Sequence, residues 1–171
     1  MEEFTMTIIK NRTDKEPVCS ADIKKALCDY FYTKRNCIYF CKEMLLQNDT
    51  RADFIALNHF VNKSIEIEIK ISWSDFMADF KNKKLKHIAY NSGVAPVNYF
   101  AFCVPLDMYD KCKEFLDKNY PKYGLFIYSN HSVCQDRISV FSRKKLLTER
   151  TTTITKDSVA KQMAIHIVYG N

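Results

Sequence analysis

Two acidic side chains and a lysine stand at a spacing that suits metal-dependent cleavage of a phosphodiester. Asp53 is followed, after a gap of 14 residues, by Glu68-Ile69-Lys70 at the end of a strongly apolar segment. Cleavage of this bond needs carboxylates that hold a hard divalent cation. It also needs a cationic group near the attacking water and the charge that develops on phosphorus. Asp53, Glu68 and Lys70 are therefore the candidate catalytic residues.

The segment that ends in Lys70 alternates strictly between apolar and polar residues from 64 to 71, which predicts a β-strand. Its isoleucines take one face, and Glu66, Glu68 and Lys70 take the other. On a solvated hairpin such charges form a surface ion pair worth about 0–1 kcal/mol, without function. On a strand inside a mixed sheet they define a site, with Glu66 expected at its periphery. For Asp53, the alternative is a turn residue that hydrogen-bonds its own backbone.

The pattern of apolar residues predicts an alternating order of helices and strands. We expect an edge strand at 4–9, a helix from an N-cap at Ser20, and strands at 37–46, 52–57 and 64–71 with a turn at 48–50. A long helix follows from Ser72 or Ser74 to about Tyr90, then a strand at 99–104, a helix capped by Asp107, strands at 124–128 and 138–141, and a helix at 157–168.

The long helix is expected to divide its side chains between two sides. The apolar side holds Phe76, Met77, Phe80 and Ile88, and the polar side holds Asp75, Asp79, Lys83, Lys86 and Tyr90. We expect Asp75 and Asp79 to pair with Lys83 or arginine partners and so to have a structural role.

This order predicts an α/β (α+β) fold in which a mixed central sheet is flanked by helices. The 171 residues fit a single domain, 1–171, whose core covers about 20–142 and whose C-terminal connector and helix cover 143–171. The three consecutive strands between the first two helices are expected to form a meander.

At these residues the chain resembles the PD-(D/E)XK, or restriction-endonuclease-like, nuclease superfamily, whose core runs helix, three-strand meander, helix, strand. It resembles most the MmcB-like DNA-repair and phage branch, over roughly 21–142. The residues that carry this resemblance are Arg51-Ala52-Asp53, Glu68-Ile69-Lys70, the spaced Asp75, Phe76, Asp79, Lys81 and Tyr90, the strand 99–105 that ends in Val104-Pro105, and the later strand 124–127 that begins Gly124-Leu125.

The resemblance implies a nuclease that hydrolyses DNA in repair, recombination or phage DNA processing. Asp53, Glu68 and the Ile69 carbonyl would hold Mg²⁺ or Mn²⁺, and Lys70 would orient the attacking water and stabilise the transition state. Glu43 is a candidate extra ligand, or else a solvated carboxylate at a strand end. The alternative is a non-catalytic nucleic-acid-binding or interaction module on the same fold. A carboxylate-pair glycosidase would leave Lys70 without a role.

The charge distribution favours a polyanionic partner. The formal net charge is +6, from 26 Lys and Arg against 20 Asp and Glu. Beside a metal site, basic residues would follow a phosphate backbone, and Tyr90 would stack or hydrogen-bond. Away from such a site they form an ordinary polar helix face. The candidate nucleic-acid contacts are Arg51, Lys81, Lys83, Lys84, Lys86 and Tyr90. A second basic group is 143–145.

Composition excludes several other classes. Three glycines cannot build a phosphate loop or a dinucleotide fingerprint. Seven cysteines without a CxxC pair are typical of a reduced protein in the cytoplasm, or in the host cytoplasm if the protein is phage-encoded. Cys37 and Cys41 are expected to be buried thiols. The sequence shows no signal peptide or membrane-spanning run, so we expect no membrane partner. A homodimer is compatible with the resemblance.

Overall fold

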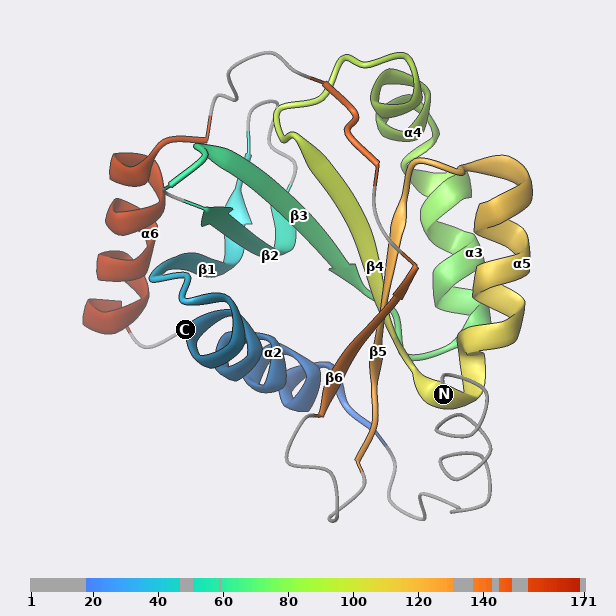
Figure 1. Cartoon of the computed structure of the whole chain (residues 1–171), viewed down its shortest axis with the longest axis horizontal. Coiled ribbons are helices and arrows are strands. Elements are labelled where there is room, and N and C mark those ends of the chain that lie inside the picture. The colour runs from blue at the N-terminus through green and yellow to red at the C-terminus, as the bar shows by residue number, and fades with distance from the viewer. Residues whose placement is uncertain are drawn as a thin grey trace.

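The computed structural model describes residues 18–46, 51–58, 60–130, 137–142, 145–148 and 154–169. The predicted strand at 4–9, the turn at 48–50 and the basic residues 143 and 144 lie outside these ranges. The elements are shown in Figure 1 and are α2 (Ser20–Asp29), η1 (Tyr30–Lys34), β1 (Tyr39–Leu45), β2 (Arg51–Asn58), β3 (Lys63–Ile69), α3 (Trp73–Asn82), α4 (Lys84–Asn91), β4 (Tyr99–Pro105), η3 (Leu106–Met108), α5 (Tyr109–Asn119), β5 (Gly124–Tyr128), β6 (Ile138–Ser142) and α6 (Lys156–Tyr169).

The strands of the described residues form one mixed sheet in the order β1-β2-β3-β4-β5-β6. The first three strands pair antiparallel, which confirms the predicted meander. β3, β4 and β5 then pair in parallel, and β6 returns antiparallel to β5. Parallel neighbours require crossover connections, and here α3–α4 and α5 supply them. The predicted mixed α/β architecture is confirmed.

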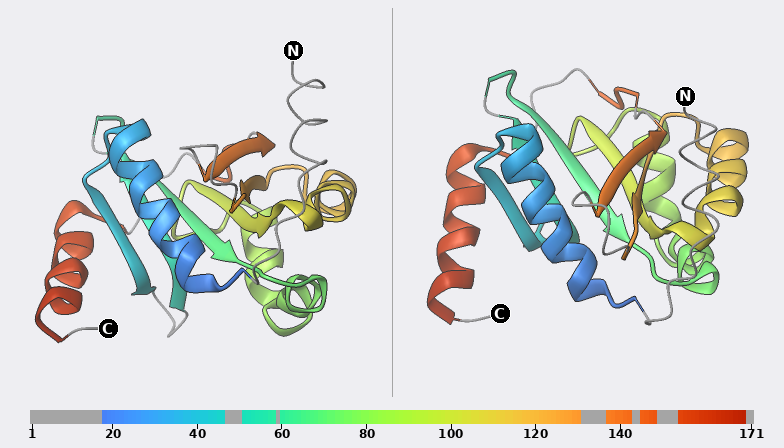
Figure 2. Two further views of the ribbon diagram at one scale, coloured as in Figure 1. Left: turned by 90° about the horizontal axis from the view of Figure 1, so that it is seen from below. Right: turned by 60° about the horizontal axis from the view of Figure 1, so that its bottom comes forward.

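Each face of the sheet is buried against helices. On one face the isoleucines of β3 pack with α2, where Ile23 and Leu27 are completely buried. On the other face Phe100 and Phe102 of β4 pack with Phe76 of α3 and with residues of α5. Figure 2 shows α2 lying across one side of the sheet while α3 and α5 lie together on the other. The two faces of β3 therefore lead to two different environments.

α6 packs at the outer end of the sheet, beside β1 (Figure 1). Its Val159 is completely buried and belongs to the core on the α3 and α5 side. The predicted helix 157–168 is confirmed.

The long helix predicted after β3 is two helices, and this is the main correction to the predicted elements. Ser72 caps α3 as expected, because its hydroxyl accepts a hydrogen bond from the Asp75 amide at 3.2 Å. Lys83, with φ −108° and ψ 32°, then separates α3 from α4. Because the axis changes there, Ile88 is exposed and does not continue the apolar side of α3 as predicted.

Two predicted helix starts were displaced by a residue or two. α2 begins at Ser20 itself, and Cys19 is the N-cap residue, without a side-chain cap hydrogen bond. Asp107 lies within the 3-10 turn η3, and α5 begins at Tyr109. Cys37 and Cys41 are buried as expected, and burial raises the pKa of Cys41 to about 11.

Candidate functional site

Asp53 is bound to the backbone between the two other candidate catalytic residues. Its Oδ2 accepts a hydrogen bond from the Ile69 amide at 2.8 Å. Phe54 pairs with Ile67 in the antiparallel ladder, so continuing this register by one residue sets Asp53 level with Glu68. Asp53 therefore lies beside Glu68 and Lys70, although 14 residues separate it from Glu68 in the sequence.

The electrostatic environment of Asp53 reflects this convergence. Burial raises the pKa of Asp53 above its ordinary value, and the negative charge of Glu68 raises it further. The Ile69 hydrogen bond and the charge of Lys70 act in the opposite direction and offset only part of this effect. A positive charge placed between Asp53 and Glu68 would thus relieve a repulsion that the fold itself creates.

Glu68 and Lys70 are buried, which excludes the alternative of a solvated surface pair. Glu68 is 1% exposed, and Lys70 is 7% exposed. Lys70 Nζ lies 3.5 Å from Glu68 Oε2 and 2.7 Å from Asp79 Oδ1. Lys70, which directly follows β3, is therefore held between an acid of β3 and an acid of α3.

Two lysines of the α3–α4 segment contact both oxygens of Glu68. Lys83 Nζ lies 2.8 Å from Oε2, and Lys86 Nζ lies 2.6 Å from Oε1. Burial opposes ionisation of Glu68, but the charges of Lys86 and Lys83 and the Lys83 hydrogen bond together outweigh it, so the pKa of Glu68 falls below its usual value. Burial likewise opposes the charge on Lys83 and Lys86, and the facing carboxylates reverse this and raise the pKa of both lysines.

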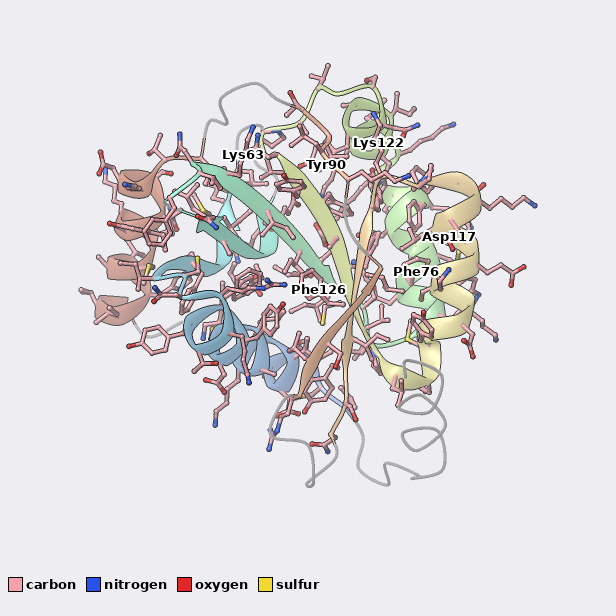
Figure 3. The ribbon with its side chains drawn as sticks, viewed as in Figure 1. Lys63, Phe76, Tyr90, Asp117, Lys122 and Phe126 are labelled. Carbon is pink, nitrogen blue, oxygen red and sulfur yellow. The ribbon has the colours of Figure 1, made fainter. Side chains whose placement is uncertain are left out.

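Glu66, expected at the periphery of the site, is completely buried on the same face of β3 as Glu68. Its Oε1 accepts a hydrogen bond from Lys86, and its Oε2 accepts one from the Tyr90 hydroxyl, each at 2.6 Å. Burial raises the pKa of Glu66, and the positive charge of Lys86 offsets part of that rise. Figure 3 labels Tyr90, whose ring extends from α4 over the sheet. Both Lys86 and Tyr90 thus direct their polar ends inward.

Asp79 anchors α3 to this site, as its predicted structural role implies. It pairs with Lys83 at 3.0 Å and with Lys70 at 2.7 Å. Its Oδ2 also lies 2.9 Å from His87 Nε2, and His87 Nδ1 lies 3.0 Å from the Tyr123 hydroxyl. Burial opposes ionisation of Asp79, but the contacts with His87 and Lys70 outweigh it and hold its pKa well below the ordinary value.

Sequence reasoning missed His87 and Tyr123. A signal for His87 was present, because Asp79, Lys83 and His87 are spaced four apart and so share a helical face. No comparable signal exists for Tyr123, which follows α5 and meets His87 only through the tertiary fold.

We call Glu66, Glu68, Lys70, Asp79, Lys83 and Lys86 the carboxylate–lysine cluster. With the adjoining Asp53 it brings together four carboxylates and three ammonium groups, which leaves one excess negative charge before His87 is counted. Buried charges of this kind are tolerated only when paired. Each member of the cluster has a partner of opposite charge, whereas Asp53 has the hydrogen bond from the Ile69 amide.

The remaining candidate residues lie outside this cluster. Glu43, in β1 with φ 53°, pairs with Lys24 of α2, and the Arg51 guanidinium lies 4.0 Å from its other oxygen. Lys81 and Lys84 are exposed. The described contacts of Glu43 therefore go to basic residues of α2 and β2, while its role as a metal ligand stays a prediction.

The donor set at Asp53 and Glu68 fits a hard divalent ion in type. Within the described residues no group of three or more His, Cys, Asp or Glu side chains is arranged to hold a metal ion. Mg²⁺, however, binds through one or two carboxylates and keeps several waters. A carboxylate oxygen has two lone pairs, so Glu68 Oε1 retains one beside Lys86. A bound ion would share Glu68 with the lysines, and the Ile69 carbonyl as a ligand stays a prediction.

The fold has relatives among solved structures. It is similar to a protein of unknown function from Silicibacter pomeroyi, with a TM-score of 0.56, 16% identity, and coverage of 92% of this chain and 90% of that one. An fdxN element excision controlling factor protein from Anabaena variabilis aligns with a TM-score of 0.44 and 16% identity, over 70% of this chain and 96% of that one. No family model and no curated protein matches the sequence.

Among the described residues, no helix has the length and apolar character that a membrane span requires.

Proposed function

We propose that this chain is a Mg²⁺- or Mn²⁺-dependent nuclease of the PD-(D/E)XK superfamily, of its MmcB-like branch, that hydrolyses DNA in repair, recombination or phage DNA processing. The observation that carries this proposal is the hydrogen bond from the Ile69 amide to Asp53. It fixes one acid beside the acid-any-lysine sequence of the neighbouring strand. The similar structure from Silicibacter pomeroyi is of a protein of unknown function, so it shows the fold and does not bear on the activity.

Asp53 and Glu68 would hold the ion. The ion supplies a water of lowered pKa and neutralises the charge on phosphorus. The chain's own residues position these groups. The Ile69 amide fixes the Asp53 carboxylate, and Lys70 keeps its ammonium 3.5 Å from Glu68. That ammonium would hold the water and stabilise the phosphorane charge, a contribution of about 3 kcal/mol.

The surface around the cluster would receive the phosphate backbone. Lys81 and Lys84 are exposed on α3 and α4, and Arg51 is exposed at the start of β2, near Asp53 in sequence. Lys83 is intermediate, with its ammonium on Glu68 and about a third of its side chain exposed. These four residues can contact phosphates, while Lys86 and Tyr90 act inside the site.

The test is cleavage of a panel of labelled single-stranded, duplex and branched DNAs, with and without Mn²⁺. Wild type should cleave at least one of them only with the metal. Asp53→Ala, Glu68→Ala and Lys70→Ala should each abolish cleavage, while Asp117→Ala, an exposed carboxylate on α5, should cleave as wild type does. Cleavage at the parental rate by any of the three variants would show that the assignment is wrong.

The second candidate is a non-catalytic nucleic-acid-binding module on the same fold. One observation favours it: Lys83 and Lys86 each contact one oxygen of Glu68, so the lysines already neutralise the acid. Such a module would bind DNA without turnover, and Mn²⁺ would not raise its melting temperature. A metal-dependent rise in melting temperature that Asp53→Ala abolishes would exclude it.

A further inference from the structure

A basic groove lies on the face of the sheet opposite the candidate site. It consists of two adjoining hollows of about 440 Å³ and about 260 Å³, which share Tyr30 and Lys34 as a common wall. Ala56 of β2 and Ile65 of β3 form part of the larger hollow, and both belong to the core under α2. Glu66, next to Ile65, points to the other face, so the groove and the cluster are separated by the sheet.

The charge of this groove is strongly one-sided. Lys34, Arg35 and Lys63 line the larger hollow, and none of its described lining residues is acidic. The smaller hollow adds Lys25 and Arg137, with Asp29 as the one acid among its described lining residues. Within the part of the chain that the structure describes, five cations and one carboxylate line the pair of hollows, which is the balance expected of a surface that receives a polyanion.

Aromatic rings form the walls and floor of the larger hollow. Phe31 and Phe126 are buried and form its floor, while Tyr30 and Tyr99 are only partly buried. Figure 3 labels Phe126 in the interior and Lys63 at the start of β3. Partly exposed rings next to cations are the arrangement on which the bases of a single strand stack.

Arg35 is held in place for this role. Its Nε donates a hydrogen bond to the Tyr30 hydroxyl at 2.8 Å, and its guanidinium lies 5.4 Å from the centre of that ring. Tyr30 begins the π-helical turn η1 that ends α2, and π-helical turns occur frequently at functional sites. The guanidinium is thus fixed at the mouth of the hollow before any ligand arrives.

We propose that this groove binds a segment of single-stranded nucleic acid, with phosphates on Lys34, Arg35 and Lys63 and a base against Tyr30 or Tyr99. An acidic peptide would satisfy the cations but offers no flat ring to the tyrosines. The inference goes beyond the proposed cleavage and does not depend on it, because the groove contains neither Asp53 nor Glu68.

The test is fluorescence anisotropy with a labelled oligothymidylate of about 12 nucleotides, in EDTA so that no cleavage occurs. Arg35→Ala combined with Lys63→Ala should weaken binding at least about tenfold, and should make the negative slope of log K against log salt shallower by about 1.4. The matched control is Lys118→Ala with Lys161→Ala, which removes two exposed lysines from α5 and α6. It should change the affinity less than about threefold.

Arg35→Lys provides a second variant that keeps the charge and loses the Nε hydrogen bond to the Tyr30 hydroxyl. It should weaken binding by about threefold without changing the salt slope. Absence of binding by wild type, equal affinities of the two double variants, or equally effective competition by polyglutamate would overturn the inference. The cleavage test measures metal-dependent turnover and this test measures binding in EDTA, so failure of the cleavage proposal and failure of this one give different results.

Discussion

The carboxylate of Asp53 accepts a hydrogen bond from the Ile69 amide at 2.8 Å, across the pair β2–β3. This single contact joins an acid of one strand to the backbone between an acid and a lysine of the next. Burial is the main cause of the raised Asp53 pKa, and the hydrogen bond also keeps Asp53 close enough to Glu68 for the Glu68 charge to raise it further. The fold therefore holds two like charges together, at a cost that a cation would remove.

Replacement of Asp53 separates its charge from its hydrogen bond. Asp53→Asn keeps an oxygen for the Ile69 amide and removes the repulsion with Glu68, so its free energy of unfolding should lie within about 0.5 kcal/mol of wild type or above it. Asp53→Ala leaves the amide without that acceptor and should lose about 1 kcal/mol. Urea unfolding measures both. Both variants should lose cleavage by at least about 100-fold, and cleavage by Asp53→Asn at the wild-type rate would contradict the role of the charge.

Lys86 carries the greatest predicted effect on stability. Its ammonium lies 2.6 Å from Glu66 and 2.6 Å from Glu68, and its side chain is 8% exposed. Lys86→Met leaves two buried carboxylates facing each other and should lower the free energy of unfolding by about 3–5 kcal/mol. Adding Glu66→Gln to Lys86→Met removes one of those charges and should restore part of the loss. If the double variant is less stable than Lys86→Met, repulsion between Glu66 and Glu68 is not the cause of the loss.

Asp79 should make stability depend on pH in the acid range. Its pKa is lowered in the folded state, so its stabilising effect is fully present above the ordinary aspartate pKa and is lost as pH falls through the folded-state value. The gap in unfolding free energy between wild type and Asp79→Asn should be about 3 kcal/mol at pH 5 and should shrink as pH is lowered toward 2. Denaturant unfolding at several pH values measures the gap. Asp117→Asn, which loses an exposed pair with Lys113, should differ from wild type by less than about 1 kcal/mol throughout. A gap that stays constant from pH 5 to 2 would contradict the lowered pKa.

The alternation of residues 64–71 was enough to predict both faces of β3. Ile65, Ile67 and Ile69 lie in the core under α2, and Glu68 and Lys70 lie on the other face. Successive side chains of a strand point to opposite faces, so the alternation of residue types identifies both faces. Helix caps and turn residues then predict the neighbouring elements. The meander and the order of elements were predictable for the same reason.

The break at Lys83 and the inward direction of Lys86 were not predictable in this way. No proline or glycine marks the end of α3, and a lysine on a helix is usually solvated. Lys83 and Lys86 turn inward because Glu66 and Glu68, 15 to 20 residues earlier in the chain, offer buried carboxylates. A helical wheel does not contain that information, since the partners lie on a strand.

Lys83 is the residue that best separates a metal enzyme from a binding module. It competes with any cation for Glu68 Oε2, from which its ammonium lies 2.8 Å. Lys83→Met should therefore raise the affinity for Mn²⁺ by about tenfold, since a vacated carboxylate oxygen becomes a ligand. Isothermal titration with Mn²⁺ measures this, and Lys84→Met, which removes the exposed neighbouring charge, is the matched control and should change the affinity less than about twofold. If Lys83→Met and Lys84→Met bind Mn²⁺ equally, Glu68 Oε2 is not a metal ligand. If neither variant binds it, Glu68 is not a ligand and the cluster serves only to hold α3 and α4 on the sheet.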